Sequence, residues 1–77
     1  MNLHMFDIYG AVEEVVIAAN EEDARALALT FATPDDLKDA VFDEYDDDAD
    51  FTRGEETKKV REWCEQEGRG YFASCYA

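Results

Sequence analysis

The first part of the chain carries two short segments whose apolar residues are spaced as in β-strands. In residues 3–9, Phe6 and Ile8 fall on one side of an extended chain. Gly10 then marks a turn, and residues 12–19 are rich in the β-branched residues valine and isoleucine. The pattern predicts a β-hairpin formed by these two segments.

The next segment repeats its apolar residues at helical spacing. Asn20 is a favourable N-cap, because its side chain can accept a hydrogen bond from a free amide of the first turn. Ala24, Leu27, Ala28 and Phe31 follow at i, i+3, i+4 and i+7. This stripe predicts an amphipathic helix that buries one side.

A proline separates this helix from a second one. Pro34 disfavours the helical conformation at Thr33, which ends the first helix. The same pair suits the N-cap and first position of a new helix. The spacing predicts a second helix that continues into the acidic residues beyond it. Its narrow apolar side would consist of Leu37, Ala40, Val41 and Tyr45.

The pattern in the last third of the sequence predicts a third helix and a final strand. Residues 52–55 read Thr-Arg-Gly-Glu, which is the spacing of a capping box, and predict a helix over residues 53–67. Gly68 suits the position that follows a helix. The aromatic segment 70–76 is typical of a strand. The apolar stripe of this helix would be Val60, Trp63 and Cys64.

The order of these elements defines the expected fold. Two strands, three helices and a last strand give the order ββ-ααα-β. The last strand has only the N-terminal hairpin to pair with. We therefore predict a single compact α+β domain over residues 1–77, in which two or three helices pack on one face of a three-stranded antiparallel sheet.

Charge adds a functional constraint to this fold. The 77 residues include 20 acids and seven Lys and Arg, and the formal net charge is -13. Residues 13–50 hold fourteen of the acids but only two bases, Arg25 and Lys38. Long-range repulsion disfavours direct binding to nucleic acid or to an anionic membrane, and the same field attracts basic protein grooves. We expect a monomer, because copies of the acidic surface repel each other.

Residues 43–50 are the centre of this charge, with six acids in eight residues. One hypothesis is a solvated loop that only keeps the protein soluble. Another is a polyanion-like surface, because helical residues three or four apart stand about 5 to 6 Å from each other, comparable to neighbouring phosphates. That row would contain Asp35, Asp36, Asp39, Asp43 and Asp46 or Asp47. The candidate partner-binding residues are Asp35, Asp36, Asp39, Asp43, Glu44, Asp46, Asp47, Asp48 and Asp50.

A calcium site is the third hypothesis for the same run. The spacing of an EF-hand loop is met by Glu44 at position 1, Asp46, Asp48 and Asp50 at positions 3, 5 and 7, and Glu55 at position 12. The first position is usually Asp, and Ala49 stands where the loop needs glycine. The alternative is therefore a weak, EF-hand-like calcium binder.

No residue pattern predicts catalysis. His4 is the only histidine and has no nucleophile beside it in the chain, and Cys64 and Cys75 are expected to be reduced, buried thiols. Glycine-rich phosphate loops and nucleophile elbows are absent from the sequence. We expect no enzymatic activity, no cofactor and no metal ion. The N-terminus has no secretion signal, so we expect a cytoplasmic protein.

Aromatic residues offer a different kind of interaction surface. We expect Trp63 in the core, because it lies on the apolar stripe of its helix. If one sheet face is uncovered, Tyr71, Tyr76 or Tyr9 would be exposed on it, as in a small regulatory or adaptor module. Such a module would bind with little dependence on salt.

The acids of residues 13–50 on a ββ-helical scaffold, and the strand-to-helix passage of residues 15–24, resemble small, acidic, single-domain phage proteins. This class includes anti-CRISPR proteins and other DNA-mimicking inhibitors. The resemblance implies inhibition by stoichiometric binding in the host bacterial cytoplasm. The acidic face would occupy a Lys- and Arg-lined channel of a CRISPR surveillance complex and exclude target DNA.

Overall fold

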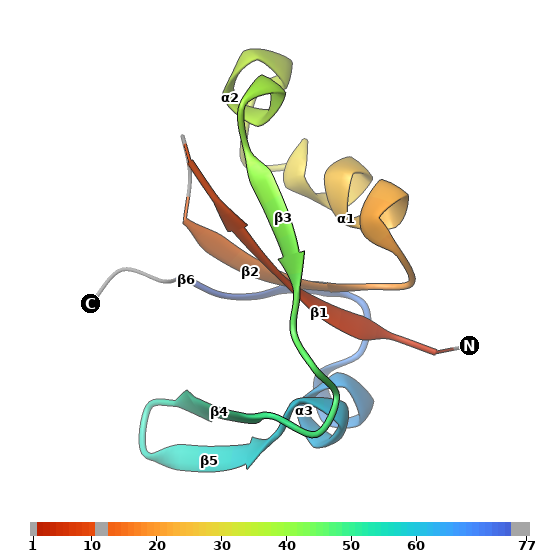
Figure 1. Ribbon diagram of the computed structural model, residues 1–77, viewed down its shortest axis with the longest axis vertical. Helices are drawn as coiled ribbons and strands as arrows, with labels where there is room; N and C mark the ends of the chain where they lie inside the picture. Colours follow the sequence, from red (N-terminus) through yellow and green to blue (C-terminus); the bar gives the residue numbers. More distant parts are fainter. Residues whose placement is uncertain (1, 11–12, 75–77) are drawn as a thin grey trace.

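The computed structural model describes residues 2–10 and 13–74 and has an α+β fold, as predicted (Figure 1). The elements are β1 (His4–Tyr9), β2 (Glu14–Ala18), α1 (Glu21–Ala28), α2 (Pro34–Lys38), β3 (Val41–Glu44), β4 (Asp50–Arg53), β5 (Glu56–Lys59), α3 (Val60–Glu67) and β6 (Gly70–Ser74).

Two antiparallel sheets form within the described part of the chain. The larger one has the strand order β3-β1-β2-β6, and β4 pairs with β5 in a separate hairpin. The predicted N-terminal hairpin is confirmed, with a register that runs from His4 opposite Ala18 to Ile8 opposite Glu14. The last strand pairs with this hairpin, as expected, through β2. The sheet has four strands where three were predicted, because β3 adds to the free edge of β1.

The larger sheet is covered on both faces. Phe6, Ile8, Val16 and Ala18 pack against α1 and α2, whereas Met5, Val15 and Ile17 pack against α3. Figure 1 shows α1 and α2 on one side of this sheet, and α3 with the β4–β5 hairpin on the other. The prediction that all helices cover one face is wrong. Adjacent residues of β1 and of β2 are apolar, and adjacent residues point to opposite faces, so both faces need cover.

The start of α1 agrees with the sequence. Asn20 is the N-cap, and its Oδ1 accepts a hydrogen bond from the Asp23 amide at 2.8 Å. Asp23 turns its own carboxylate to the amide of Ala19 at 3.0 Å, one residue before the cap. The strand β2 therefore passes into α1 through a fixed corner.

The second predicted helix is only one turn long. Thr33 and Asp36 form a capping box, and Pro34 begins α2, as expected. The helix ends at Lys38, and residues 41–44 form β3, paired with β1. Val41 and Phe42 favour a strand, and the unpaired backbone of β1 offers them ladder hydrogen bonds that an exposed helix does not. The predicted helix through Tyr45 is therefore wrong.

The third predicted helix also begins later than expected. Residues 52–55, interpreted as a capping box, instead end β4 and turn the chain into β5. Gly54 has φ of +66° and Glu55 does not have a positive φ, as in a two-residue type II′ hairpin turn. Thr52 and Thr57 face each other across this hairpin, with 2.7 Å between their hydroxyl oxygens. Helix α3 then runs from Val60 to Glu67.

Candidate acidic interaction surface

The candidate acids follow the free edge of the larger sheet. In Figure 1 the chain descends from α2 through β3 to the turn that leads into the β4–β5 hairpin and α3. Asp35 and Asp36 lie in the first turn of α2, and Asp39 is its C-cap. Asp43 and Glu44 lie on β3. The remaining acids of the run, Asp46, Asp47, Asp48 and Asp50, lie in the turn and at the start of β4.

The proposed helical row of acids does not exist. A row spaced by three and four residues needs one continuous helix through Asp43, but α2 ends at Lys38. The acids are instead distributed over a short helix, an edge strand and a turn. The structure therefore places them along one edge, in an arrangement different from the predicted one.

The turn after β3 is fixed by its own polar groups. Asp46 Oδ1 accepts a hydrogen bond from the Asp48 amide at 2.9 Å, and the Asp46 carbonyl accepts one from the Ala49 amide at 3.1 Å. The carbonyls of Asp47 and Ala49 accept hydrogen bonds from the Arg61 and Val60 amides at 3.1 and 2.9 Å. The first amides of α3 thus have backbone partners, although the side chain of its N-cap, Lys59, accepts no hydrogen bond.

Asp48 in this turn and Asp50 at the start of β4 have basic partners at the end of β5 and in α3. Asp48 forms an ion pair with Arg61, and Lys59 Nζ lies 3.9 Å from the Asp50 carboxylate. Lys59 Nζ also donates to the Asp48 carbonyl at 3.2 Å. These contacts attach the turn to α3. They also neutralise part of the negative charge of the turn.

His4 lies beside the same acids, a position that the sequence did not indicate. Its Nδ1 lies 3.4 Å from a Glu44 oxygen and 3.7 Å from an Asp47 oxygen. The atom is inaccessible to solvent, and none of its contacts in the described structure has hydrogen-bond geometry. When protonated, His4 would bridge β3 to the turn that follows it.

Almost all of the basic residues form ion pairs within the protein. All seven Lys and Arg lie in the described part of the chain, and six of them form ion pairs with acids. Lys38 is the exception. Among the described residues, the carboxylates of Asp35, Asp39 and Asp43 have no basic partner or hydrogen bond. The charge that remains available to a partner is therefore strongly negative.

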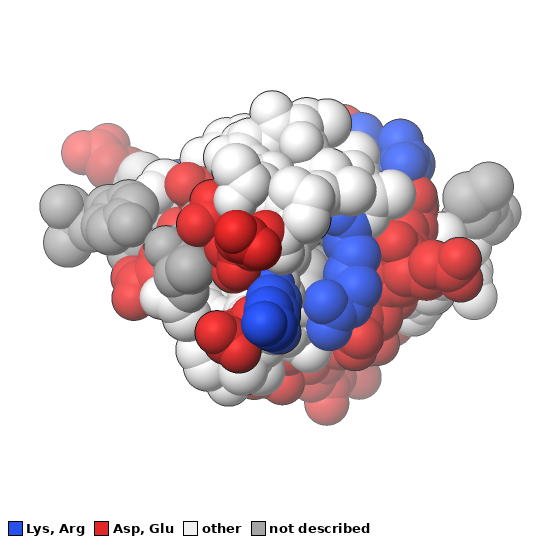
Figure 2. Space-filling view, turned by 90° about the horizontal axis from the view of Figure 1, so that it is seen from above, with Lys and Arg blue, Asp and Glu red and all other residues white. Residues whose placement is uncertain are grey.

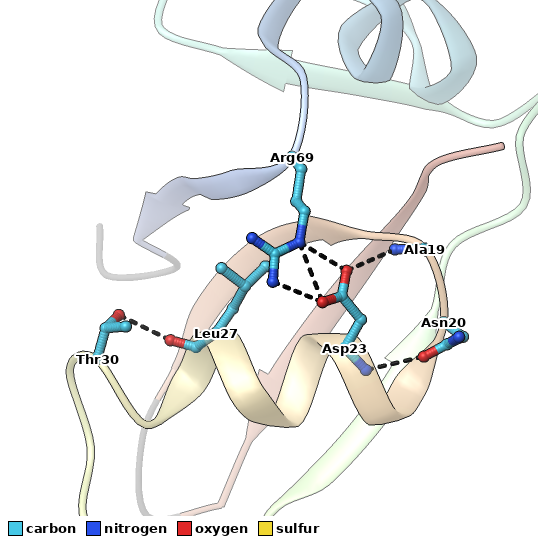
Figure 3. Close-up of polar contacts among 6 residues, drawn as sticks. All are labelled: Ala19, Asn20, Asp23, Leu27, Thr30 and Arg69. Carbon is cyan, nitrogen blue, oxygen red and sulfur yellow. Dashed lines mark hydrogen bonds and ion pairs between the residues drawn. The ribbon is translucent and has the colours of Figure 1, made fainter. Parts of the chain in front are cut away.

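The most extensive ion pair joins distant parts of the chain. Arg69, between α3 and β6, donates from Nε and Nη2 to both carboxylate oxygens of Asp23 in α1, at 2.6 to 3.0 Å (Figure 3). The Arg69 hydrogen bonds, followed by that from the Ala19 amide, lower the pKa of Asp23 to about 2. The ion pair neutralises the charge of Arg69. It also links the connection between α3 and β6 to α1, which packs on the other face of the sheet.

This pair predicts a dependence of stability on acid pH. The pKa of Asp23 is lower in the folded state than its ordinary value of 3.8, so its contribution is fully present above about pH 4 and disappears as pH falls to about 2. Thermal melts should show a melting temperature lower for Asp23→Asn than for the natural protein at pH 5. This difference should shrink progressively between pH 4 and pH 2. A difference that stays constant over that window would contradict the assignment.

Cys64 has the environment of a structural thiol. It is 3% exposed and lies on the core-facing side of α3. Burial, followed by the negative charges of Asp47 and Glu65, raises its pKa to about 11. At neutral pH the group is therefore a protonated thiol, which is a weak nucleophile. A polar depression of about 330 Å³ beside it is lined by Asn2, Leu3, Asp47, Arg61, Cys64 and Glu65. Cys75, the second thiol that was expected to be buried, lies outside the described residues.

The EF-hand alignment is wrong. A helix should stand on each side of the loop, but Glu44 ends β3, and Asp50 begins β4. Glu55, the expected bidentate ligand, lies in the turn of the β4–β5 hairpin. Within residues 2–10 and 13–74, no group of three or more His, Cys, Asp or Glu side chains is arranged to hold a metal ion.

A second surface is formed by uncharged side chains. Leu29, Phe31 and Tyr71 are exposed, and the rings of Phe31 and Tyr71 contact edge to face at 5.7 Å. Figure 2 shows the molecule from above, with a broad uncharged area beside Lys and Arg and with Asp and Glu around it. Tyr71 and Tyr9 are exposed as expected, but the open sheet face that was to carry them is covered. Tyr76 lies outside the described residues.

No family model, curated protein or solved structure matches this chain. None of the helices in the described part of the chain is long and apolar enough to cross a membrane.

Proposed function

We propose that this protein is a non-enzymatic inhibitor that binds through its acidic edge to a basic, nucleic-acid-binding groove of another protein. The candidate partner is the DNA-binding channel of a CRISPR surveillance complex, in keeping with the resemblance to anti-CRISPR proteins. The protein would act as a monomer in the bacterial cytoplasm and would not itself bind nucleic acid.

The observation that supports this proposal best is that most of the basic residues form ion pairs within the protein. Six of the seven Lys and Arg are paired within the molecule, whereas Asp35, Asp39 and Asp43 have no partner among the described residues. Repulsion among unpaired acids lowers the stability of a small domain, so a surface that keeps them is consistent with a binding role. The pairing also prevents the bases from repelling a cationic groove.

The mechanism follows from charges that are already in position. A basic groove gains affinity for DNA by neutralisation of charge and release of counterions. A folded acidic edge can occupy the same groove with little further ordering of its own chain, because the run is fixed by backbone hydrogen bonds to α3. Target DNA is then excluded by competition, and no chemical step is needed.

A pull-down with the tagged protein tests this function. The bait is incubated with nuclease-treated lysate from bacteria that carry active CRISPR systems, and bound proteins are eluted with a salt gradient. We expect a DNA-binding complex that elutes as salt rises, and the purified complex should lose duplex binding when the protein is added in equimolar amount. Recovery of only salt-resistant partners would overturn the proposal and direct attention to the uncharged surface around Phe31 and Tyr71.

A further inference from the structure

β3 is an edge strand whose bonded side can be assigned. The Tyr45 amide donates to the Met5 carbonyl at 2.9 Å, and the register places Asp43 opposite Asp7. Hydrogen-bonded and non-bonded pairs alternate along an antiparallel ladder. The main-chain groups of Asp43 and Tyr45 therefore point toward β1.

The main-chain groups of Phe42 and Glu44 consequently point away from the sheet. β3 is the first strand in the order β3-β1-β2-β6, and no element is drawn in front of it in Figure 1. No side chain in the described part of the molecule hydrogen-bonds to these outward groups. Two N–H and two C=O groups thus stand ready to pair with another strand.

The charge on this edge selects among possible occupants. Asp43 and Glu44 are exposed on β3, and Asp39 and Asp46 lie just beyond its ends. A second copy of β3 would bring these acids against one another, which opposes edge-to-edge pairing of two copies. A segment bearing Lys or Arg would instead neutralise them.

The order of side chains along β3 specifies the segment further. Its sequence is two apolar residues, Val41 and Phe42, followed by two acids, Asp43 and Glu44. Val41 is 46% exposed, and the half-buried ring of Phe42 lies under the Arg25 guanidinium at 4.3 Å. An added antiparallel strand passes these residues in reverse order. It would place two bases first and two apolar residues second.

We propose that β3 accepts an extended segment of the basic partner as an additional antiparallel strand, with the local pattern base-base-apolar-apolar. Backbone hydrogen bonds to Phe42 and Glu44 supply affinity, and Glu44 and Asp43 select the two bases. This inference rests on the proposed function, because it describes how the same acidic edge recognises its partner.

Hydrogen exchange at single amides tests the inference. The probe is a capped peptide with a central Lys-Lys-Val-Val segment, added to the isotopically labelled full chain and followed by NMR. Saturating peptide should slow exchange at the Phe42 and Glu44 amides by about tenfold or more, because these gain partners. The Asp43 and Tyr45 amides, already turned to β1, should change much less. The same peptide with N-methyl groups throughout its central segment keeps its charge and should lose this effect.

A pair of variants separates backbone pairing from charge. Glu44→Pro and Glu44→Gln both remove one carboxylate, but only proline removes the outward amide, and proline is tolerated at such an edge position. We expect the proline variant to bind the peptide about tenfold more weakly than the glutamine variant. Equal affinities, together with unchanged exchange at Phe42 and Glu44, would overturn strand addition. If binding remains salt-dependent in that case, the proposed function survives; if it does not, the proposed function fails as well.

Discussion

Replacing Asp35, Asp39 and Asp43 together by lysine should lower affinity for the basic partner by on the order of 100-fold. Each of these acids lacks a basic partner among the described residues, so the variant removes charge from the edge without breaking an ion pair. Its melting temperature should stay close to that of the natural protein. Affinity is measured by calorimetric titration of the complex captured in the pull-down, and inhibition by competition with duplex DNA.

In the matched control, lysine replaces Glu22, Glu55 and Glu62. These residues lie on α1, in the β4–β5 turn and on α3. It makes the same change in net charge at positions outside α2, β3 and the turn that follows β3. We expect affinity to fall much less in the control, because only the acids along the free edge would contact the groove. An equal loss in both variants would mean that bulk charge, and no particular surface, drives binding.

Reversing the acids of the turn would be a poorer test. Asp48 and Asp50 pair with Arg61 and Lys59, and Asp46 caps the turn through its carboxylate. Lysine at these positions would disturb the attachment of the turn to α3 along with the surface charge. Loss of binding would then have two explanations.

Trp63→Ala should remove a large share of the free energy of unfolding of this protein. Trp63 is fully buried, its Nε1 donates to the Phe51 carbonyl at 2.7 Å, and its ring contacts that of Phe72 edge to face at 5.2 Å. Removing a buried tryptophan costs about 3–5 kcal/mol. A 77-residue domain has a total free energy of unfolding of about 4–12 kcal/mol, so this loss is a large share of it. Denaturant titration followed by circular dichroism measures the change.

Trp63→Phe is the matched variant for this prediction. It keeps an aromatic ring in the core but leaves the Phe51 carbonyl without its donor, which should cost about 1–3 kcal/mol. The variant should therefore fold with reduced stability. Circular dichroism is the suitable signal for all three proteins, because Trp63 is the only tryptophan. A melting temperature for the alanine variant within a few degrees of the natural protein would contradict the assigned core.

Local signals predicted several elements correctly. The two N-terminal strands, the cap at Asn20 and the capping box at Thr33 depend on signals within a few residues, and the structure confirms each of them. The position of Trp63 in the core is also confirmed, because an apolar stripe on a helix must face other apolar residues. These features needed no knowledge of distant contacts.

Elements that depend on a distant partner were assigned wrongly. Val41 fits the spacing of a helix, but it also suits a strand, and the open edge of β1 decides between the two. The sequence of residues 52–55 fits a capping box, yet Gly54 takes a left-handed conformation and Thr52 pairs with Thr57 across a hairpin. In both cases pairing with another strand outweighs a weak local preference.

The candidate site divides in the same way. The sequence alone determined the charge of -13 and its concentration in residues 13–50. The tertiary structure decided that the acids lie along an open strand edge, that His4 joins them, and that six bases are withdrawn into ion pairs. Composition fixes the total charge, but which charges remain free depends on contacts between residues as far apart as Asp23 and Arg69.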